Sequence, residues 1–200
     1  MQNIKPFGEV IESSLSIIKA QCWHWDDFPS FGSLITMEIQ ERTLFGLVHH
    51  IQTGSLDAQR TVFAYQKTED ELKREQPQIF EFLCTTFSCF ILGYKEHDKI
   101  IYQVPPEPPK IHTFIYKATQ QDSISFFSNE QYLPLLFSFA HHTFSLDELL
   151  LALLKNIADK QALTPQALSN FIQTFSLLTA NDYRRLKLFL QRAQSVIHFS

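Results

Sequence analysis

The fold is decided by the stretch Phe31-Gly-Ser-Leu-Ile-Thr-Met-Glu-Ile39, which is soon followed by Leu44-Phe-Gly-Leu-Val-His-His-Ile51. In the first run, apolar residues alternate with Thr36 and Glu38, which is the period-two pattern of a half-buried β-strand. The second run is apolar at most positions, so both faces of its strand are expected to be covered. Only the polar residues 40–43 separate the two runs, and the sequence therefore predicts a β-hairpin.

The second run also predicts which side chains share a face. Alternation along a strand gives two sets, Phe45, Leu47 and Ile51 on one face and Leu44 and Val48 on the other. A strand covered on both faces lies between two layers of apolar side chains. We therefore expect the hairpin to be the centre of the amino-terminal half.

The composition is that of a globular protein. The chain has 200 residues, of which 44% are hydrophobic and 19% charged, with a formal net charge of -4. That charge gives no global basic field for nucleic acid or an anionic membrane. The longest apolar run, Leu149 to Leu154, is far shorter than the roughly 20 residues that span a bilayer. The three cysteines are too few for a disulfide framework, and no hydrophobic leader opens the chain, so we expect a reducing, cytoplasmic location.

The glycines divide the chain into two parts. All five lie between Gly8 and Gly93, and none follows. Glycine marks tight turns and bulges between strands, so this asymmetry favours a β-rich first part and a helical last part. We predict an α+β protein with a small barrel of about six strands and an inserted helix over residues 1–125. A helical bundle is expected over residues 126–200.

The strands and the inserted helix are predicted from local patterns. The first candidate strand spans Phe7–Ile11 and continues over Leu15–Cys22, and the central hairpin follows it. The later candidate strands are Thr86–Tyr94, Ile100–Val104, Ile111–Tyr116 and the short Ile124–Phe127. Thr68-Glu-Asp-Glu71 matches a capping box, which predicts a helix that falters near Gln76 because Pro77 disfavours a helical residue before it. A second short helix is expected from Pro77 to Leu83.

Three amphipathic helices are predicted in the last part. Their starting signals are Ser145-Leu-Asp-Glu148, read as a second capping box, then Thr164-Pro165 and Thr179-Ala-Asn-Asp182. Their apolar stripes are Leu149, Leu150, Leu153, Leu154 and Ile157; Leu168, Phe171, Ile172 and Phe175; and Tyr183, Leu186, Leu190 and Ile197. Short connections between such helices favour a small bundle.

Several glycine-containing motifs occur in a recognisable order. These are Gly8-Glu-Val-Ile11, Phe31-Gly-Ser-Leu-Ile35 and Leu44-Phe-Gly-Leu-Val48, followed by Gln76-Pro-Gln-Ile-Phe-Glu-Phe-Leu83 and Pro105-Pro-Glu-Pro-Pro-Lys-Ile-His112. Together they resemble a HAS barrel, the β-barrel at the front of HerA-type DNA translocases and of ATP synthase α and β subunits. The chain is similar to short stand-alone HAS-barrel proteins of cyanobacteria and plastids, over roughly residues 4–118.

The resemblance implies a fold and a role but no chemistry. In those assemblies the barrels form a crown that contacts partner proteins above an ATPase ring. This chain contains no Gly-x-x-x-x-Gly-Lys-Ser/Thr motif, so it is not expected to bind ATP as they do. The resemblance adds the plastid stroma to the cytoplasm as an expected location.

No constellation of residues predicts catalysis or a cofactor. The set Cys22, His24, Cys84 and Cys89 has a spacing that matches no standard zinc pattern, and buried structural thiols are the simpler interpretation. The pairs His49-His50 and His141-His142 place neighbours on different faces, which is unsuited to one metal ion. The acidic pair Asp26-Asp27 could act as acid and base, but solvated carboxylates in a loop are the simpler interpretation. We expect a protein that is not an enzyme and holds no metal or cofactor.

Two loops are predicted to bind a protein partner. Four aromatic residues gather in the first, Trp23, Trp25, Phe28 and Phe31. Exposed rings of this kind favour an interface, although a loop folded over the barrel end explains them equally well. In the second loop Pro105, Pro106, Pro108 and Pro109 are expected to form an extended, exposed spacer.

A local basic cluster supports an alternative. Arg184, Arg185, Lys187 and Arg192 lie on the last predicted helix but on different stripes. The preferred hypothesis is a non-enzymatic protein–protein interaction module, an adaptor or accessory subunit of a larger assembly. The alternative is a nucleic-acid-associated factor that works with a HerA-like or other processing machine through this helix.

Overall fold

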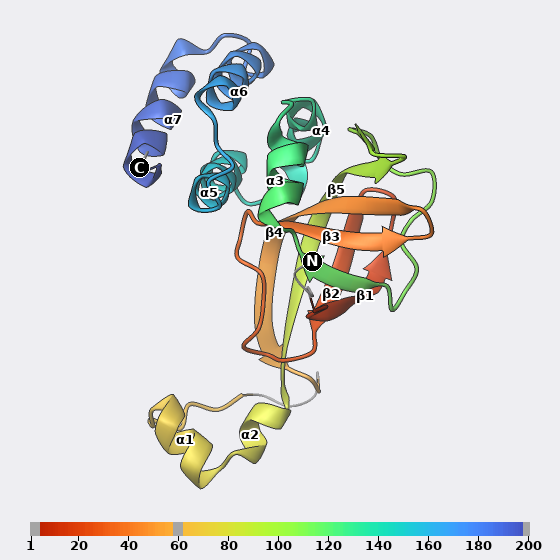
Figure 1. The fold of residues 1–200 in the computed structure, drawn as a ribbon. Helices are drawn as coiled ribbons and strands as arrows, with labels where there is room; N and C mark the ends of the chain where they lie inside the picture. The colour runs from red at the N-terminus through yellow and green to blue at the C-terminus, as the bar shows by residue number, and fades with distance from the viewer. Residues whose placement is uncertain (1–4, 58–61, 198–200) are drawn as a thin grey trace.

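The chain folds into a closed antiparallel barrel with a helical layer on one side and a projecting arm at one end (Figure 1). A computed structural model describes all residues except 1–4, 58–61 and 198–200. The barrel strands are β1 (Gly8–Ser13), β2 (Ile17–Cys22), β3 (Leu34–Ile39), β4 (Arg42–Ser55), β5 (Leu83–Glu96) and β7 (Phe114–Lys117). Their order is β2-β1-β7-β3-β4-β5, and pairing of β2 with β5 closes the barrel. The predicted six-stranded barrel with an inserted helix is confirmed.

The central hairpin is confirmed, with one correction on β4. Leu34 pairs with Leu47 and Ile39 with Arg42, so the turn is formed by residues 40 and 41. Ile51 does not share the face of Phe45, because the register shifts between Val48 and His50. A bulge adds one residue to a strand and turns the following side chains to the opposite face. Ile51 consequently packs toward the barrel interior.

Two apolar cores result from strands that are covered on both faces. The inner core fills the barrel and includes Ile35, Met37, Leu44 and Val48. The outer core lies between the strands and the helical layer, and Phe45 and Leu47 belong to it. The predicted first strand is in fact two, β1 and β2, which pair as a hairpin. The strand predicted to reach Val104 ends early, since β6 spans only Lys99–Ile101 and pairs with β5.

The helical layer begins earlier in the chain than predicted. It comprises α3 (Gln120–Phe127), α4 (Tyr132–Ser138), the short 3-10 helix η1 (Ala140–His142), α5 (Leu146–Asp159), α6 (Pro165–Leu178) and α7 (Tyr183–Val196). The prediction of a strand over Ile124–Phe127 is wrong, because these residues belong to α3. Thr119 and Asp122 form a complete capping box, and the buried residues Ser123, Phe126 and Phe127 have helical spacing. Residue 125, the predicted domain boundary, therefore lies inside a helix.

The caps of the last three helices largely follow the prediction. Ser145, Thr164 and Asp182 each accept a hydrogen bond from a backbone N–H in the first turn. Ser145 gives half of the predicted capping box, because the Glu148 carboxylate instead accepts from Arg192 at 2.6 Å. The apolar stripe predicted for α7 is partly wrong. The buried side chains are Phe189, Ala193 and Ile197, while Tyr183 is 74% exposed.

Helix α5 fastens the layer to the rim of the barrel. Gly32 at this rim has φ +74, and a Cβ placed there would lie 2.7 Å from the Ala152 Cβ. The absence of a side chain thus lets α5 approach the rim closely. The Asn156 side-chain amide donates to the Phe31 carbonyl at 3.0 Å, and the Lys160 ammonium donates to the Ala118 carbonyl at 2.8 Å. In the described part of the chain, no helix is long and apolar enough to cross a membrane.

Candidate functional site

The four aromatic residues predicted to form one surface are directed to different parts of the molecule. The Trp23 ring meets Phe114 edge-on at 5.3 Å, and the Trp25 ring stacks on Phe80 at 5.5 Å. Phe31 packs against Phe144 at 5.8 Å. Phe28 is exposed, as is Trp23, whereas Trp25 and Phe31 are half-buried. The loop is therefore not one aromatic cluster.

The proline loop is only partly exposed, which corrects the prediction for two of its four prolines. Pro105 and Pro109 are buried, whereas Pro106 and Pro108 are exposed. The Ser13 hydroxyl donates to the Pro109 carbonyl, so the loop is held against β1. A proline lacks the N–H donor but keeps its carbonyl as an acceptor, and this contact uses it. Only the middle of the loop is presented to solvent.

The basic cluster on α7 is divided between two sides of the helix. Arg185 donates to the Asp147 carboxylate at 2.6 and 3.3 Å, and Arg192 donates to Glu148 at 2.6 Å. Both carboxylates belong to α5, so these two guanidinium groups hold the helices together. The hydrogen bond to Asp147 raises the pKa of Arg185. Arg184 and Lys187 are exposed on the other side.

Two of the three candidate thiols and one of the four imidazoles in the two His-His pairs are placed as packing groups, whereas Cys84 is only half-buried and His50, His141 and His142 are exposed. Cys22 and Cys89 are buried in the inner core, and burial raises the pKa of the Cys22 thiol to about 12. A thiol that stays protonated is a poor nucleophile and metal ligand. His49 stacks on Phe90 with 3.7 Å between ring centroids, and burial lowers its pKa to about 4. Among the described residues, no group of three or more His, Cys, Asp and Glu side chains is arranged to hold a metal ion.

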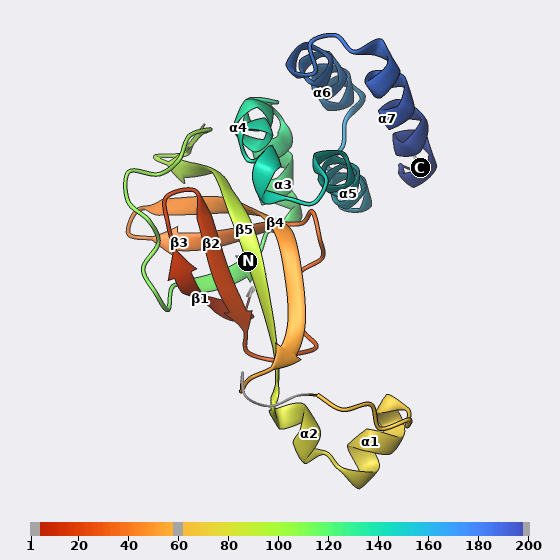
Figure 2. The same cartoon turned by 180° about the vertical axis from the view of Figure 1, so that it is seen from behind.

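A projecting arm forms the surface that the sequence analysis missed. Strands β4 and β5 continue beyond the barrel as a two-stranded ribbon, in which Thr53 pairs with Thr85 and Ser55 with Leu83. The ribbon leads to α1 (Glu69–Glu75) and α2 (Gln78–Glu81), which lie at the end of the molecule away from the helical layer (Figure 2). The predicted capping box at Thr68 and the break at Gln76 are confirmed. Neither helix contains a buried residue.

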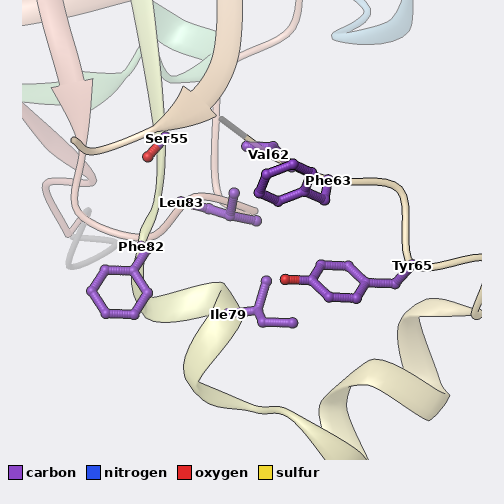
Figure 3. Close-up of a pocket in the computed structure, with 7 residues that line it drawn as sticks. All are labelled: Ser55, Val62, Phe63, Tyr65, Ile79, Phe82 and Leu83. Atoms are coloured by element: carbon purple, nitrogen blue, oxygen red, sulfur yellow. The ribbon is translucent and has the colours of Figure 1, made fainter. Parts of the chain in front are cut away.

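Apolar side chains nevertheless gather on the arm. A cavity of about 110 Å³ lies at the base of α2. Figure 3 shows the residues that line it, which are Ser55, Val62, Phe63, Tyr65, Ile79, Phe82 and Leu83. Phe63, Tyr65, Ile79 and Leu83 converge on it, while the Phe82 ring is directed away. Phe63 is 71% exposed, Val62 58% and Leu56 57%. We call the side chains that line this cavity, together with Leu56, the arm patch.

The arm patch has the chemistry of a binding surface. Its lining is mainly apolar, and the Ser55 and Tyr65 side chains each contribute a hydroxyl. Large exposed side chains gathered around a concavity typically mark an interaction site. The signal for it was the run Val62-Phe-Ala-Tyr65, three residues before the Thr68 cap, which has no place in either core.

Comparison of the sequence with models of known protein families and with curated proteins finds no match.

Proposed function

We propose that this protein is a non-enzymatic protein–protein interaction module, an adaptor or accessory subunit of a larger assembly, with the arm patch as its main binding surface. The observation that carries the proposal is the exposure of Leu56, Val62 and Phe63 on an arm outside both cores. Complete burial of such a side chain stabilises a complex by about 1.5–3 kcal/mol before the costs of association. Burial of all three would thus be a large favourable contribution to a complex.

We also propose that the barrel is of the HAS type. The glycines that carry the resemblance lie where a side chain is hard to place, which supports this assignment. A Cβ at Gly8 would lie 2.5 Å from the Gln21 carbonyl oxygen, and Gly32 has a positive φ at the rim. The helical layer covers the barrel near Gly32, so the arm at the other end is left for a partner chain.

The first loop contacts the arm through Trp25. Its ring stacks on Phe80 of α2, and its carbonyl accepts from the Thr85 hydroxyl at 2.5 Å. Trp25 thus supports the base of the arm. Trp23 with Phe114, both close to half exposed, is a second aromatic surface that a larger partner would reach.

The nucleic-acid alternative is less favoured. Two of the four cations on α7 are engaged by carboxylates, which leaves Arg184 and Lys187 for phosphate contacts. Each phosphate contact adds to the loss of affinity as salt rises, and a complex with few such contacts is weak. Binding to the arm patch is expected to survive added salt better, because its contacts are mainly apolar. A salt titration of any complex therefore distinguishes the two functions.

Affinity capture with matched variants tests the proposal. Phe63→Asp places a charge in the arm patch. The control, Leu15→Asp, places the same charge at an exposed apolar residue outside the arm patch, because Leu15 is 44% exposed in the turn between β1 and β2. Both variants should keep the circular dichroism spectrum of the original protein. We expect Phe63→Asp to lose the proteins captured from the native cell and Leu15→Asp to retain them. Equal capture by both variants would contradict the proposal.

A further inference from the structure

We infer that the arm patch is occupied by a second copy of this chain, which docks the solvent-facing side of its α7 there. This inference rests on the proposed function of the arm patch. It identifies the partner from the chemistry of the two surfaces, which are complementary and lie on the same chain. Neither surface is used by the fold itself.

The solvent-facing side of α7 is apolar and basic. Tyr183 is 74% exposed and Leu188 53%, and Arg184 and Lys187 are exposed beside them. Arg184 lies four residues before Leu188 and therefore on the same side of the helix. Over the part of the chain that the structure describes, neither Arg184 nor Lys187 is within ion-pair distance of a carboxylate. The sequence of α7 contains four cations and no carboxylate.

The arm offers the opposite charge around an apolar cavity. Residues 62–83 contain five carboxylates and three cations, a net charge of -2. Two of the cations are already used within the arm, where Lys67 pairs with Glu75 and Lys73 pairs with Glu69. Asp70 and Glu81 are exposed. A cation on a docked helix would thus meet an excess of negative charge.

The size of the cavity suits the apolar group on α7. A dry cavity of about 150 Å³ holds a benzene molecule, so one of about 110 Å³ has room for a single aliphatic side chain. Leu188 is the exposed aliphatic residue flanked by Arg184 and Lys187. Insertion of Leu188 into the cavity would bring both cations to the acidic arm. The docked helix would then gain from apolar burial and from charge complementarity.

The positions of the two surfaces determine the kind of assembly. The arm and α7 lie at opposite ends of the molecule in both views (Figures 1 and 2). One copy therefore cannot fill its own arm patch, but it can fill that of a neighbour. An interface between two different surfaces is head-to-tail and repeats, forming a closed ring or an open filament.

Sedimentation velocity on the full chain tests this inference. The unaltered protein should form species larger than a monomer that grow with concentration. Phe63→Asp and Leu188→Asp should each be monomeric, because each removes one of the two surfaces. A mixture of the two variants should form a 1:1 dimer and nothing larger, because one variant keeps its α7 and the other keeps its arm patch.

The control and the contradicting results are defined by the same experiment. Leu15→Asp should assemble like the unaltered protein. An unaltered protein that stays monomeric at every concentration, or a mixture that stays monomeric, overturns the inference. If the unaltered protein is monomeric but Phe63→Asp loses its captured partner, the proposed function stands and the second copy is the wrong occupant. If Phe63→Asp loses neither assembly nor capture, both are wrong.

Discussion

The arm and the helical layer are both helical additions to one barrel, and they start in the same way. Thr68 with Glu71 begins α1 and Thr119 with Asp122 begins α3, each through a complete capping box. Their burial differs entirely. Neither helix of the arm buries a residue, whereas α3 alone buries Ser123, Phe126 and Phe127. A local capping signal therefore starts a helix, and apolar residues at helical spacing decide whether the helix joins a core.

This difference separates stability from binding. The helical layer shares its core with the outward faces of β4 and β5, so it is part of the folded unit. The arm extends from the same two strands but contributes to neither core through its helices. We therefore expect changes in the layer to alter the free energy of unfolding. Changes in the arm should alter association instead.

The largest contrast is expected from one substitution made in both regions. Phe126 is fully buried and lies 4.7 Å from Phe45 and 5.2 Å from Tyr102 between ring centroids. Phe126→Ala should lower the free energy of unfolding by about 3–5 kcal/mol, the usual cost of removing a core phenylalanine. Phe63→Ala on the arm should change it by about 0.5 kcal/mol or less. Urea denaturation of both variants measures this, and similar losses would remove the distinction between the regions.

The free energy of unfolding should depend on pH through His49, which packs against the helical layer. The His49 ring lies between the barrel and the layer, since it stacks on Phe90, which in turn stacks on Phe139. Burial, together with the smaller effects of the nearby His50 and His142, lowers its pKa from 6.5 to about 4. The folded state then binds fewer protons than the unfolded state between these values. Stability is full above pH 6.5 and falls as the pH drops toward 4, by about 3 kcal/mol in total.

His49→Gln isolates this contribution. The glutamine does not titrate, so the free energy of unfolding should become less dependent on pH between 6.5 and 4. The measurement is denaturation with urea at several pH values for both proteins. An unchanged pH dependence in the variant would mean that other groups are responsible.

The smallest contrast is expected from the two capping boxes. Thr119→Ala removes the cap of α3 and should lower the free energy of unfolding by about 1 kcal/mol. Thr68→Ala removes the matching cap of α1, a helix without buried residues, and should leave the global value unchanged. Faster amide hydrogen exchange confined to residues 69–75 would report its local effect. A global loss from Thr68→Ala would show that the arm is part of the folding unit.

The sequence reveals the barrel more readily than the contacts around it. Alternation and glycine placement predict the hairpin, because a strand imposes period two on its side chains. The bulge that turns Ile51 inward cannot be predicted locally, because no glycine or proline lies at the register shift between Val48 and His50. Ile124–Phe127 are apolar or small enough to suit a strand. The local signal for their helix is the capping box of Thr119 and Asp122, and the contact of Phe126 with Phe45, which is distant in sequence, joins that helix to the outer core.

The candidate site is harder to predict for the same reason. The aromatic residues from Trp23 to Phe31 are clustered in sequence, but their partners lie on β7, on α2 and beside α5. The arm patch joins Ser55 to residues that follow it by as many as 28 positions, from Val62 to Leu83. Such a surface appears only when β4 and β5 are paired. Exposure of Phe63 is likewise a property of the fold and not of its local sequence.

Removal of the arm tests the central claim most directly. Ser55 and Leu83 are paired in the ribbon, so an Asn-Gly turn can join them in place of residues 56–82. We predict that the shortened protein keeps its free energy of unfolding within about 1 kcal/mol and loses both self-association in sedimentation velocity and its captured partners. The loss of the Trp25–Phe80 contact accounts for the small change allowed. A shortened protein that is unfolded, or that still associates, would contradict the account.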